Sequence, residues 1–206
     1  LVNEREVEGI NAGKVRERLM KDGFPADLGF EPATFHQTSR IVRADEYVMG
    51  TVSRTPAGVR IEAELRLVRS AGTKQPLEPI TAPDLDVAGD LAAKALIAAR
   101  AQLVHERRCM NALREGKGAE ALRFARAGIA AVPRGTFVRA CEVGAHFAAK
   151  SPALEVLASA EALLAIDPTS REGLDGAGRV LNQLGRRDAA AEMWLRLAAT
   201  DTASTD

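Results

Sequence analysis

The strongest constraint on the fold of this chain is a repeat in its C-terminal half. Pro133 and Pro168 lie 35 residues apart, and each follows an apolar run at the end of an expected helix. Proline stops a helix because it lacks the amide hydrogen and clashes with the preceding turn. Working back from each proline predicts three units of two helices, over residues 102–135, 136–170 and 171–204, with turns at 116–118, 150–152 and 184–186.

Small side chains recur at the same place in each unit, where paired helices have to approach closely. The sets are Cys109, Gly144 and Gly178 in the middle of the first helices, and Ala121, Val156 and Ala190 at the start of the second helices. A plain helical bundle would show this spacing in three successive units only by coincidence. The C-terminal half is therefore predicted to be a stack of helix pairs, in which each pair contacts its neighbours.

Residues 174–190, from Leu-Asp-Gly-Ala-Gly to Arg-Asp-Ala-Ala, resemble a tetratricopeptide repeat, and the segment Ala-Ile-Asp-Pro168 resembles the end of one. The resemblance covers about half of the chain. The middle unit departs from the pattern, with Ser151 in place of the usual turn glycine and Val156 in place of the usual alanine. The resemblance implies a helical array that binds other proteins.

The N-terminal half has mixed helix and strand patterns. Residues 59–69 alternate between apolar and charged side chains, which predicts a strand with one buried face. Thr55-Pro56-Ala57-Gly58 predicts a tight turn before it. The expected elements are helices over 4–22, 32–42 and 84–100 and strands over 46–54 and 59–69, with the last helix packed on the buried face of the sheet. The fold class is thus α+β, with a small α/β domain over 1–100 and the helical repeats over 101–206.

Residues 44–52 and 59–68 give this N-terminal layout a similarity to the TolB N-terminal and CsgG-like type of domain from bacterial envelope proteins. That type opens with a strand before its first helix, whereas only Leu1 and Val2 precede the expected helix here. Either that strand lies upstream of this segment, or the sheet is one strand short. In the second case its open edge could accept a strand from a partner. The alternative is an edge that is capped by a loop or by charge.

Composition and motifs argue against catalysis. Lys+Arg and Asp+Glu are equal at 28 each, so the positive surplus of a nucleic-acid-binding protein is missing; Arg107 and Arg108 are interpreted as a solvated helix face. No apolar run is long enough for a membrane span. His36, His105 and His146 lack the spacing of metal ligands. Gly116-Lys117-Gly118 lacks the glycine spacing of a phosphate loop. We therefore expect no enzyme activity, cofactor, bound metal or nucleic-acid partner.

Cys109 and Cys141 fall in the first helices of adjacent units, which pack side by side. A disulfide between them would stabilise the fold by roughly 3–4 kcal/mol and would indicate an oxidising compartment. The alternative is two small buried thiols, and the sequence favours it because adjacent helices do not guarantee the geometry that a disulfide needs.

The expected binding surface is the inner face of the array, which is lined by the first helices. Its mixture of charged, amide and apolar groups suits a peptide or a protein surface. The candidate residues are Glu106, Met110, Leu113 and Arg114 in the first unit, Cys141, Ala145 and Ala148 in the second, and Glu172, Asp175, Arg179, Asn182 and Gln183 in the third.

These observations predict a protein-binding scaffold or accessory subunit of a larger complex. The envelope resemblance implies a periplasmic or membrane-associated bacterial assembly, and the cytoplasm is the alternative location. Two other functions stay open: a regulatory or sensor fragment of a longer signalling protein, and an enzyme with a site between the two halves. The sequence offers no group of residues to nominate for such an enzyme.

Overall fold

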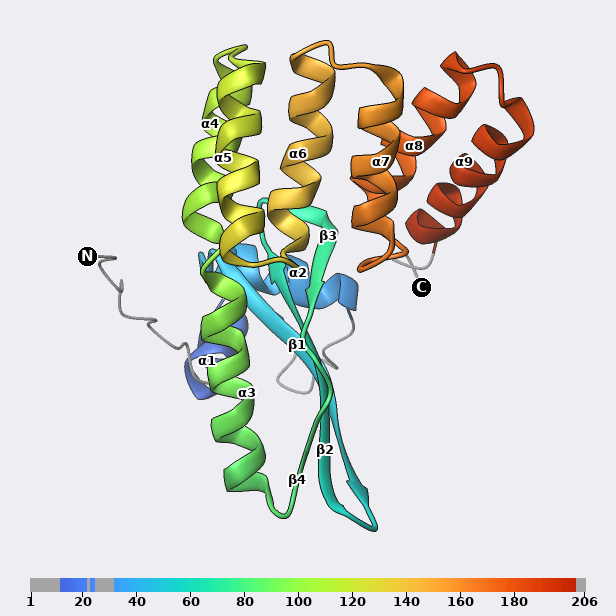
Figure 1. Ribbon diagram of the computed structural model, residues 1–206. Helices are drawn as coiled ribbons and strands as arrows, with labels where there is room; N and C mark the ends of the chain where they lie inside the picture. Colours follow the sequence, from blue (N-terminus) through green and yellow to red (C-terminus); the bar gives the residue numbers. More distant parts are fainter. Residues whose placement is uncertain (1–11, 22, 25–31, 203–206) are drawn as a thin grey trace.

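The computed structural model describes residues 12–21, 23–24 and 32–202. An antiparallel sheet in the N-terminal half is followed by an array of paired helices, which confirms the α+β class (Figure 1). None of the helices in these ranges is both long and apolar enough to cross a bilayer.

The array consists of three helix pairs, as the repeat predicted. The pairs are α4 (Leu103–Arg114) with α5 (Gly118–Ala131), α6 (Thr136–Ala148) with α7 (Ala153–Leu164), and α8 (Arg171–Gln183) with α9 (Arg187–Thr202). Each pair turns through one residue with a left-handed backbone: Gly116, Lys150 and Gly185. In the middle pair Lys150, and not the expected Ser151, takes the position of the usual glycine, with φ of 54°.

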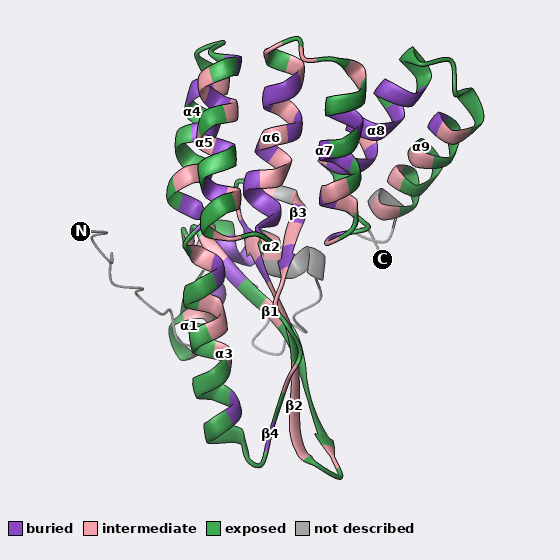
Figure 2. Ribbon diagram, in the orientation of Figure 1, coloured by how far each residue is buried: buried purple, intermediate pink, exposed green. Residues whose placement is uncertain are grey.

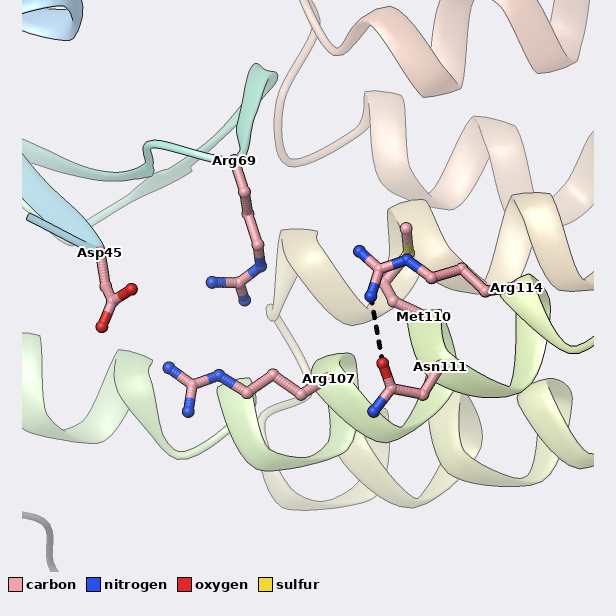
Figure 3. Close-up of a pocket in the computed structure, with 6 residues that line it drawn as sticks. All are labelled: Asp45, Arg69, Arg107, Met110, Asn111 and Arg114. Carbon is pink, nitrogen blue, oxygen red and sulfur yellow. Dashed lines mark hydrogen bonds between the residues drawn. The ribbon is translucent and has the colours of Figure 1, made fainter. Parts of the chain in front are cut away.

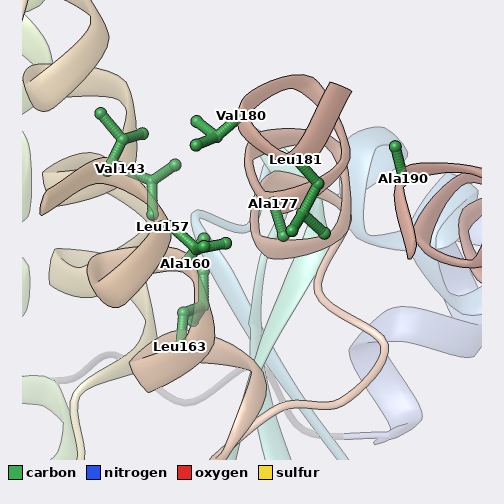
Figure 4. Close-up of a cluster of buried hydrophobic side chains, with 9 residues drawn as sticks. Val143, Leu157, Ala160, Leu163, Ala177, Val180, Leu181 and Ala190 are labelled. Carbon is green, nitrogen blue, oxygen red and sulfur yellow. The ribbon is translucent and has the colours of Figure 1, made fainter. Parts of the chain in front are cut away.

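Apolar side chains between successive helices form the core of the array. The larger cluster lies between α6, α7, α8 and α9, and Figure 4 shows Val143 of α6 and Leu157 of α7 lying opposite Val180 of α8. Ala121, Val156 and Ala190, the small residues predicted at the start of the second helices, are all buried. A Cβ atom on Gly118 would overlap the backbone nitrogen of Ala149, so α5 can approach the end of α6 only with glycine there.

The N-terminal half contains more strands than the sequence predicted. Its elements are α1 (Ala12–Lys21), α2 (Pro32–Ile41), β1 (Glu46–Thr55), β2 (Gly58–Leu67), β3 (Ser70–Pro76), β4 (Ile80–Ala82) and α3 (Leu85–Arg100). The side chain of Asp84 accepts a hydrogen bond from Val87 N at the start of α3. Residues 4–11 of the expected first helix, and the missing leading strand, lie outside the described residues.

The strand β2 is the centre of the sheet. It pairs with β1 along its whole length and, on its other side, with β3 near one end and β4 near the other, always antiparallel. The helix α3 packs on β2 and β4, on the face where a helix was expected. That face is fully buried only near the array, at Leu65 and Leu67, while Val59 and Ile61 toward the hairpin turn are half-buried. Figure 2 shows the same gradient along the hairpin.

The sheet and the array share a small core. Leu65 and Leu67 of β2 pack with Leu96 of α3, Leu103 of α4 and Phe137 of α6. Since these side chains come from both halves of the chain, the two halves are joined by apolar burial as well as by the backbone between Arg100 and Leu103.

Candidate protein-binding surface

The unpredicted strand β3 lies against the beginnings of the first helices. Gln102, Thr136 and Ser170 precede or begin α4, α6 and α8, at intervals of 34 residues, and all three are fully buried. The first turn of a helix leaves backbone N–H groups without partners inside the helix. The side chains of Gln75 in β3, of Gln102 and of Ser170 provide acceptors for several of them.

Two glutamines join β3 to the first and second helix pairs. Gln102 Nε2 donates to Gln75 Oε1 over 2.8 Å, and Gln75 Oε1 also accepts from Thr136 N over 2.9 Å. Gln102 Oε1 accepts from Phe137 N at 3.0 Å and from Val138 N at 3.3 Å. The start of α6 is therefore held by one side chain from the sheet and one from the preceding helix pair.

The middle of β3 is joined to the third helix pair and to the loop before it. Thr73 Oγ1 lies 3.1 Å from Ser170 Oγ and donates to the Glu172 carboxylate, and Lys74 N donates to Asp167 Oδ2 over 3.2 Å. The sheet thus contacts all three helix pairs through polar groups of β3, which fixes its position on the array.

A cavity opens beside this junction, between α4 and the strand ends of the sheet. Its volume is about 420 Å³. Figure 3 shows Arg69, from the turn after β2, reaching toward α4, while Arg107 of α4 extends toward Asp45. The lining residues are Asp45, Arg69, Arg107, Met110, Asn111 and Arg114.

The charge in and around this cavity is positive. The Arg69 guanidinium pairs with the Glu106 carboxylate, and Arg114 Nη1 donates to Asn111 Oδ1 over 3.1 Å. Arg107 is exposed and forms no ion pair with any residue in the described part of the chain. Three guanidiniums against the carboxylates of Glu106 and Asp45 leave an excess of positive charge at the surface.

The candidate residues of the inner face divide into separate groups. Met110 and Arg114 line the cavity, whereas Glu106 and Glu172 bond to the sheet within the chain, where an open surface was expected. Cys141 and Ala145 are buried in the core of the array. The reason is that Glu106 and Glu172 contact the sheet and that Cys141 and Ala145 contact neighbouring helices, and the repeat pattern does not give the positions of these elements.

None of the remaining candidates lines the cavity: Leu113 lies on α4, Ala148 on α6, and Asp175, Arg179, Asn182 and Gln183 lie on α8. Arg179 Nη1 is 3.7 Å from Asp175 Oδ2, and the Arg179 guanidinium carbon lies 4.2 Å from the centre of the Phe147 ring. Asn182 and Gln183 are exposed. These residues form a second polar surface further along the array.

Four of the residues that line the cavity were missed as candidates. The sequence indicates a solvated helix face for Arg107 and has no signal at Asp45, Arg69 or Asn111. The pair Arg107-Arg108 was the available signal in the sequence. It could not reveal the cavity, because Asp45 and Arg69 come from strand ends that are distant in the chain.

The structure joins Cys109 and Cys141 by a disulfide, with their Cα atoms 6.4 Å apart. The sequence favoured two free thiols because helix adjacency alone does not fix the geometry. The packing of α4 against α6 brings the two Cα atoms within the range that a disulfide spans. The bond ties the first helix pair to the second inside a cluster of alanines.

The polar groups show no arrangement suited to metal binding. Across the described ranges, no three His, Cys, Asp or Glu side chains gather to hold a metal ion. His36, His105 and His146 lie on α2, α4 and α6, and His146 Nδ1 is 2.9 Å from Ser151 Oγ.

Comparison with known proteins gives a likeness for the array alone. No family model matches the chain, and no curated protein matches it. The chain is similar to the second TPR of Spaghetti (RPAP3) bound to HSP90 peptide SRMEEVD, at 17% identity over 52% of this chain and 98% of that chain, with a TM-score of 0.48. It is also similar to the NMR structure of the first TPR domain of the human RPAP3 protein, at 16% identity over 50% of this chain and 81% of that chain, with a TM-score of 0.47.

At such low identity and TM-score, neither likeness assigns the chain to a family or carries a partner over to it. The similarity of residues 44–52 and 59–68 to TolB N-terminal and CsgG-like domains gains no support from these comparisons.

Proposed function

We propose that this chain is a non-catalytic protein-binding module, a scaffold or accessory subunit that docks an acidic segment of a partner protein at the arginine-lined cavity. The observation that carries the proposal is that Arg69, Arg107 and Arg114 all line one hollow of the surface. Guanidinium groups bind carboxylates through paired, charge-assisted hydrogen bonds, which are among the stronger polar contacts in proteins.

Arg107 and Arg114 are the groups that would bind the partner. Arg107 forms no ion pair with the described residues, and Arg114 bonds only to the neutral Asn111 there. Arg69 already pairs with Glu106, so its role would be to hold the wall of the cavity. Met110 adds a flexible apolar side chain to the same hollow, which suits a partner segment with mixed side chains.

A periplasmic or envelope location is part of the proposal. It is supported by the disulfide between Cys109 and Cys141, since such bonds persist in oxidising compartments and are rare in the cytosol. A larger membrane-associated assembly is the kind of complex in which we expect the chain to act.

The test starts with affinity purification of the protein from gently solubilised membranes and from the soluble fraction. The co-purifying chains are identified by mass spectrometry, and their affinity is then measured directly with purified components. The comparison includes an Arg107→Gln/Arg114→Gln variant and, as a matched control, an Arg123→Gln/Arg126→Gln variant on the exposed side of α5.

We expect one stoichiometric partner set with the wild type and the control. For the cavity variant we expect an affinity weaker by roughly 100- to 10,000-fold, because two guanidiniums are lost and each charged hydrogen bond contributes about 1.5–3 kcal/mol. A partner that binds the cavity variant as tightly as the wild type would rule out this site. Recovery of the protein alone, as a monomer in the soluble fraction, would refute the accessory-subunit function and favour a transient sensor role.

A further inference from the structure

The strand β1 has an open edge. Within the described residues it pairs only with β2, so the backbone N–H and C=O groups on its outer side have no strand partner there. Such an edge can pair with another chain, and proteins commonly block it with lysine, proline or a bulge. The ten residues of β1 contain neither lysine nor proline, and their register against β2 is regular throughout.

One face of β1 is also left uncovered. The helix α3 packs on β2 and β4, and Val48 and Val52 of β1 remain 41% and 62% exposed. These valines are opposite Leu65 and Ile61 of β2, so they lie on the apolar face of the sheet beside the area that α3 covers. Two exposed valines next to an open edge are the features of an interface.

The residues of β1 on this face form a self-complementary series. In order they are Glu46, Val48, Gly50, Val52 and Arg54: an acid, a valine, a glycine, a valine and a base. When two copies of β1 run antiparallel with their Gly50 residues opposite each other, Glu46 of each copy faces Arg54 of the other. Each Val48 then faces the Val52 of the second copy.

We propose that two copies of this chain pair through their β1 edges and form one continuous antiparallel sheet, with a two-fold axis at Gly50. The pairing places opposite charges and β-branched side chains directly across from each other, the combinations that stabilise antiparallel sheets. The other face brings together only uncharged side chains, with Tyr47 opposite Ser53 and Met49 opposite Thr51. If the register shifts by two residues, Glu46 no longer faces Arg54 and Val48 no longer faces Val52.

The side chains at both ends of the strand are available for this pairing. Arg54 is exposed and has no ion pair among the residues that the structure describes. Glu46 bonds to Arg100 through both oxygens, at 2.7 and 2.9 Å, and each oxygen keeps a further lone pair for a second guanidinium. Gly50 is already required within the chain, because a Cβ there would overlap the Glu62 carbonyl oxygen.

The two helical arrays are far apart in such a dimer. The strand β1 runs from the array toward the tip of the hairpin (Figure 1), so an antiparallel partner places its own array beside that tip. The two arginine-lined cavities then lie at opposite ends of an elongated particle, and both stay open for partners. The dimer therefore does not depend on the proposed function of the cavity.

The first test is the molar mass of the whole 206-residue chain, measured by light scattering across a wide range of concentration. We expect a reversible dimer. Arg54→Glu puts two pairs of like charges opposite each other and should weaken dimerisation at least about tenfold. Arg123→Glu, the same charge change at an exposed site on α5, should leave the dimer unchanged. A monomer at every concentration, or a dimer that Arg54→Glu leaves intact, overturns the proposal.

The second test reads the register. Chains with Val48→Cys and chains with Val52→Cys are mixed and oxidised mildly, because directly opposite residues have the Cα separation that a disulfide needs. Each single variant alone should cross-link poorly, and so should a mixture of Val48→Cys with Ser53→Cys, which lie on opposite faces. Equal cross-linking in all mixtures would refute the Gly50-centred pairing.

Discussion

Replacing Gln102 with leucine should destabilise the whole chain, because this buried amide joins the sheet to two helix pairs. The side chain donates to Gln75 Oε1 and to Ala99 O, and it accepts from Phe137 N and Val138 N. Leucine has a similar size but provides neither donors nor acceptors. The variant therefore leaves two backbone N–H groups at the buried start of α6 without this acceptor.

The magnitude follows from those two donors. A buried polar group without a partner costs about 1–3 kcal/mol, so the two together cost about 2–6 kcal/mol. The apolar burial of leucine offsets about 1 kcal/mol of this. The net loss is about 3 kcal/mol, which in a chain of this size lowers the melting temperature by about 6–12 °C.

The assay is thermal and urea unfolding followed by far-ultraviolet circular dichroism, with the wild type and Gln183→Leu as references. Gln183 is an exposed amide on α8, so its substitution should change the free energy of unfolding by no more than about 0.5 kcal/mol. If Gln102→Leu is as stable as Gln183→Leu, the reasoning that this side chain holds the sheet on the array is wrong.

Three further predictions concern other parts of the chain. The Cys109–Cys141 disulfide closes a loop over a separation of 32 residues. Its reduction should lower the free energy of unfolding by about 3–4 kcal/mol. Melting is measured with and without reductant, and identical curves would contradict this prediction. Gly118→Ala should destabilise the array, because the new Cβ overlaps the backbone at the end of α6. Gly89→Ala, at an open helical site, should instead stabilise the chain by about 0.5–1 kcal/mol. Urea titrations in which both variants change the free energy of unfolding in the same direction would refute the packing argument. Burial raises the pKa of Tyr47 above its usual 10.0. At a pH just above 10.0 the unfolded chain therefore loses the phenol proton while the folded chain keeps it, so the free energy of unfolding should fall as the pH rises through this range. Since this is the only tyrosine in the chain, absorbance at the tyrosinate band titrates it directly, and a lower midpoint in the folded chain than in the unfolded chain would contradict the assignment.

The helices and the first hairpin could be predicted because their signals are local. The repeat of prolines and small residues gave the three helix pairs, and the alternation over residues 59–67 gave β2 and its apolar face. In each case the side chains that favour the element lie within it or within one repeat of it. The sequence therefore contains the evidence for these elements in short windows.

The strand β3 could not be predicted in this way. Its residues, Ser-Ala-Gly-Thr-Lys-Gln-Pro, have no apolar alternation and include a glycine. Its conformation depends on pairing with β2 and on hydrogen bonds to groups at the beginnings of α6 and α8. Gln75 bonds to Thr136, which is 61 residues away in the chain, and Thr73 lies against Ser170, which is 97 residues away. Such bonds form only once the array is folded.

By itself, the sequence determined that helix pairs follow a hairpin-based sheet, because periodic side chains favour one local conformation wherever the rest of the chain lies. Only the tertiary structure decided which polar groups stay at the surface. Glu106 and Glu172 bond to the sheet, while Arg69 and Arg107 meet at a cavity. The physical reason is that a charge is paired or free according to what lies within a few ångströms of it, and those neighbours come from distant parts of the chain.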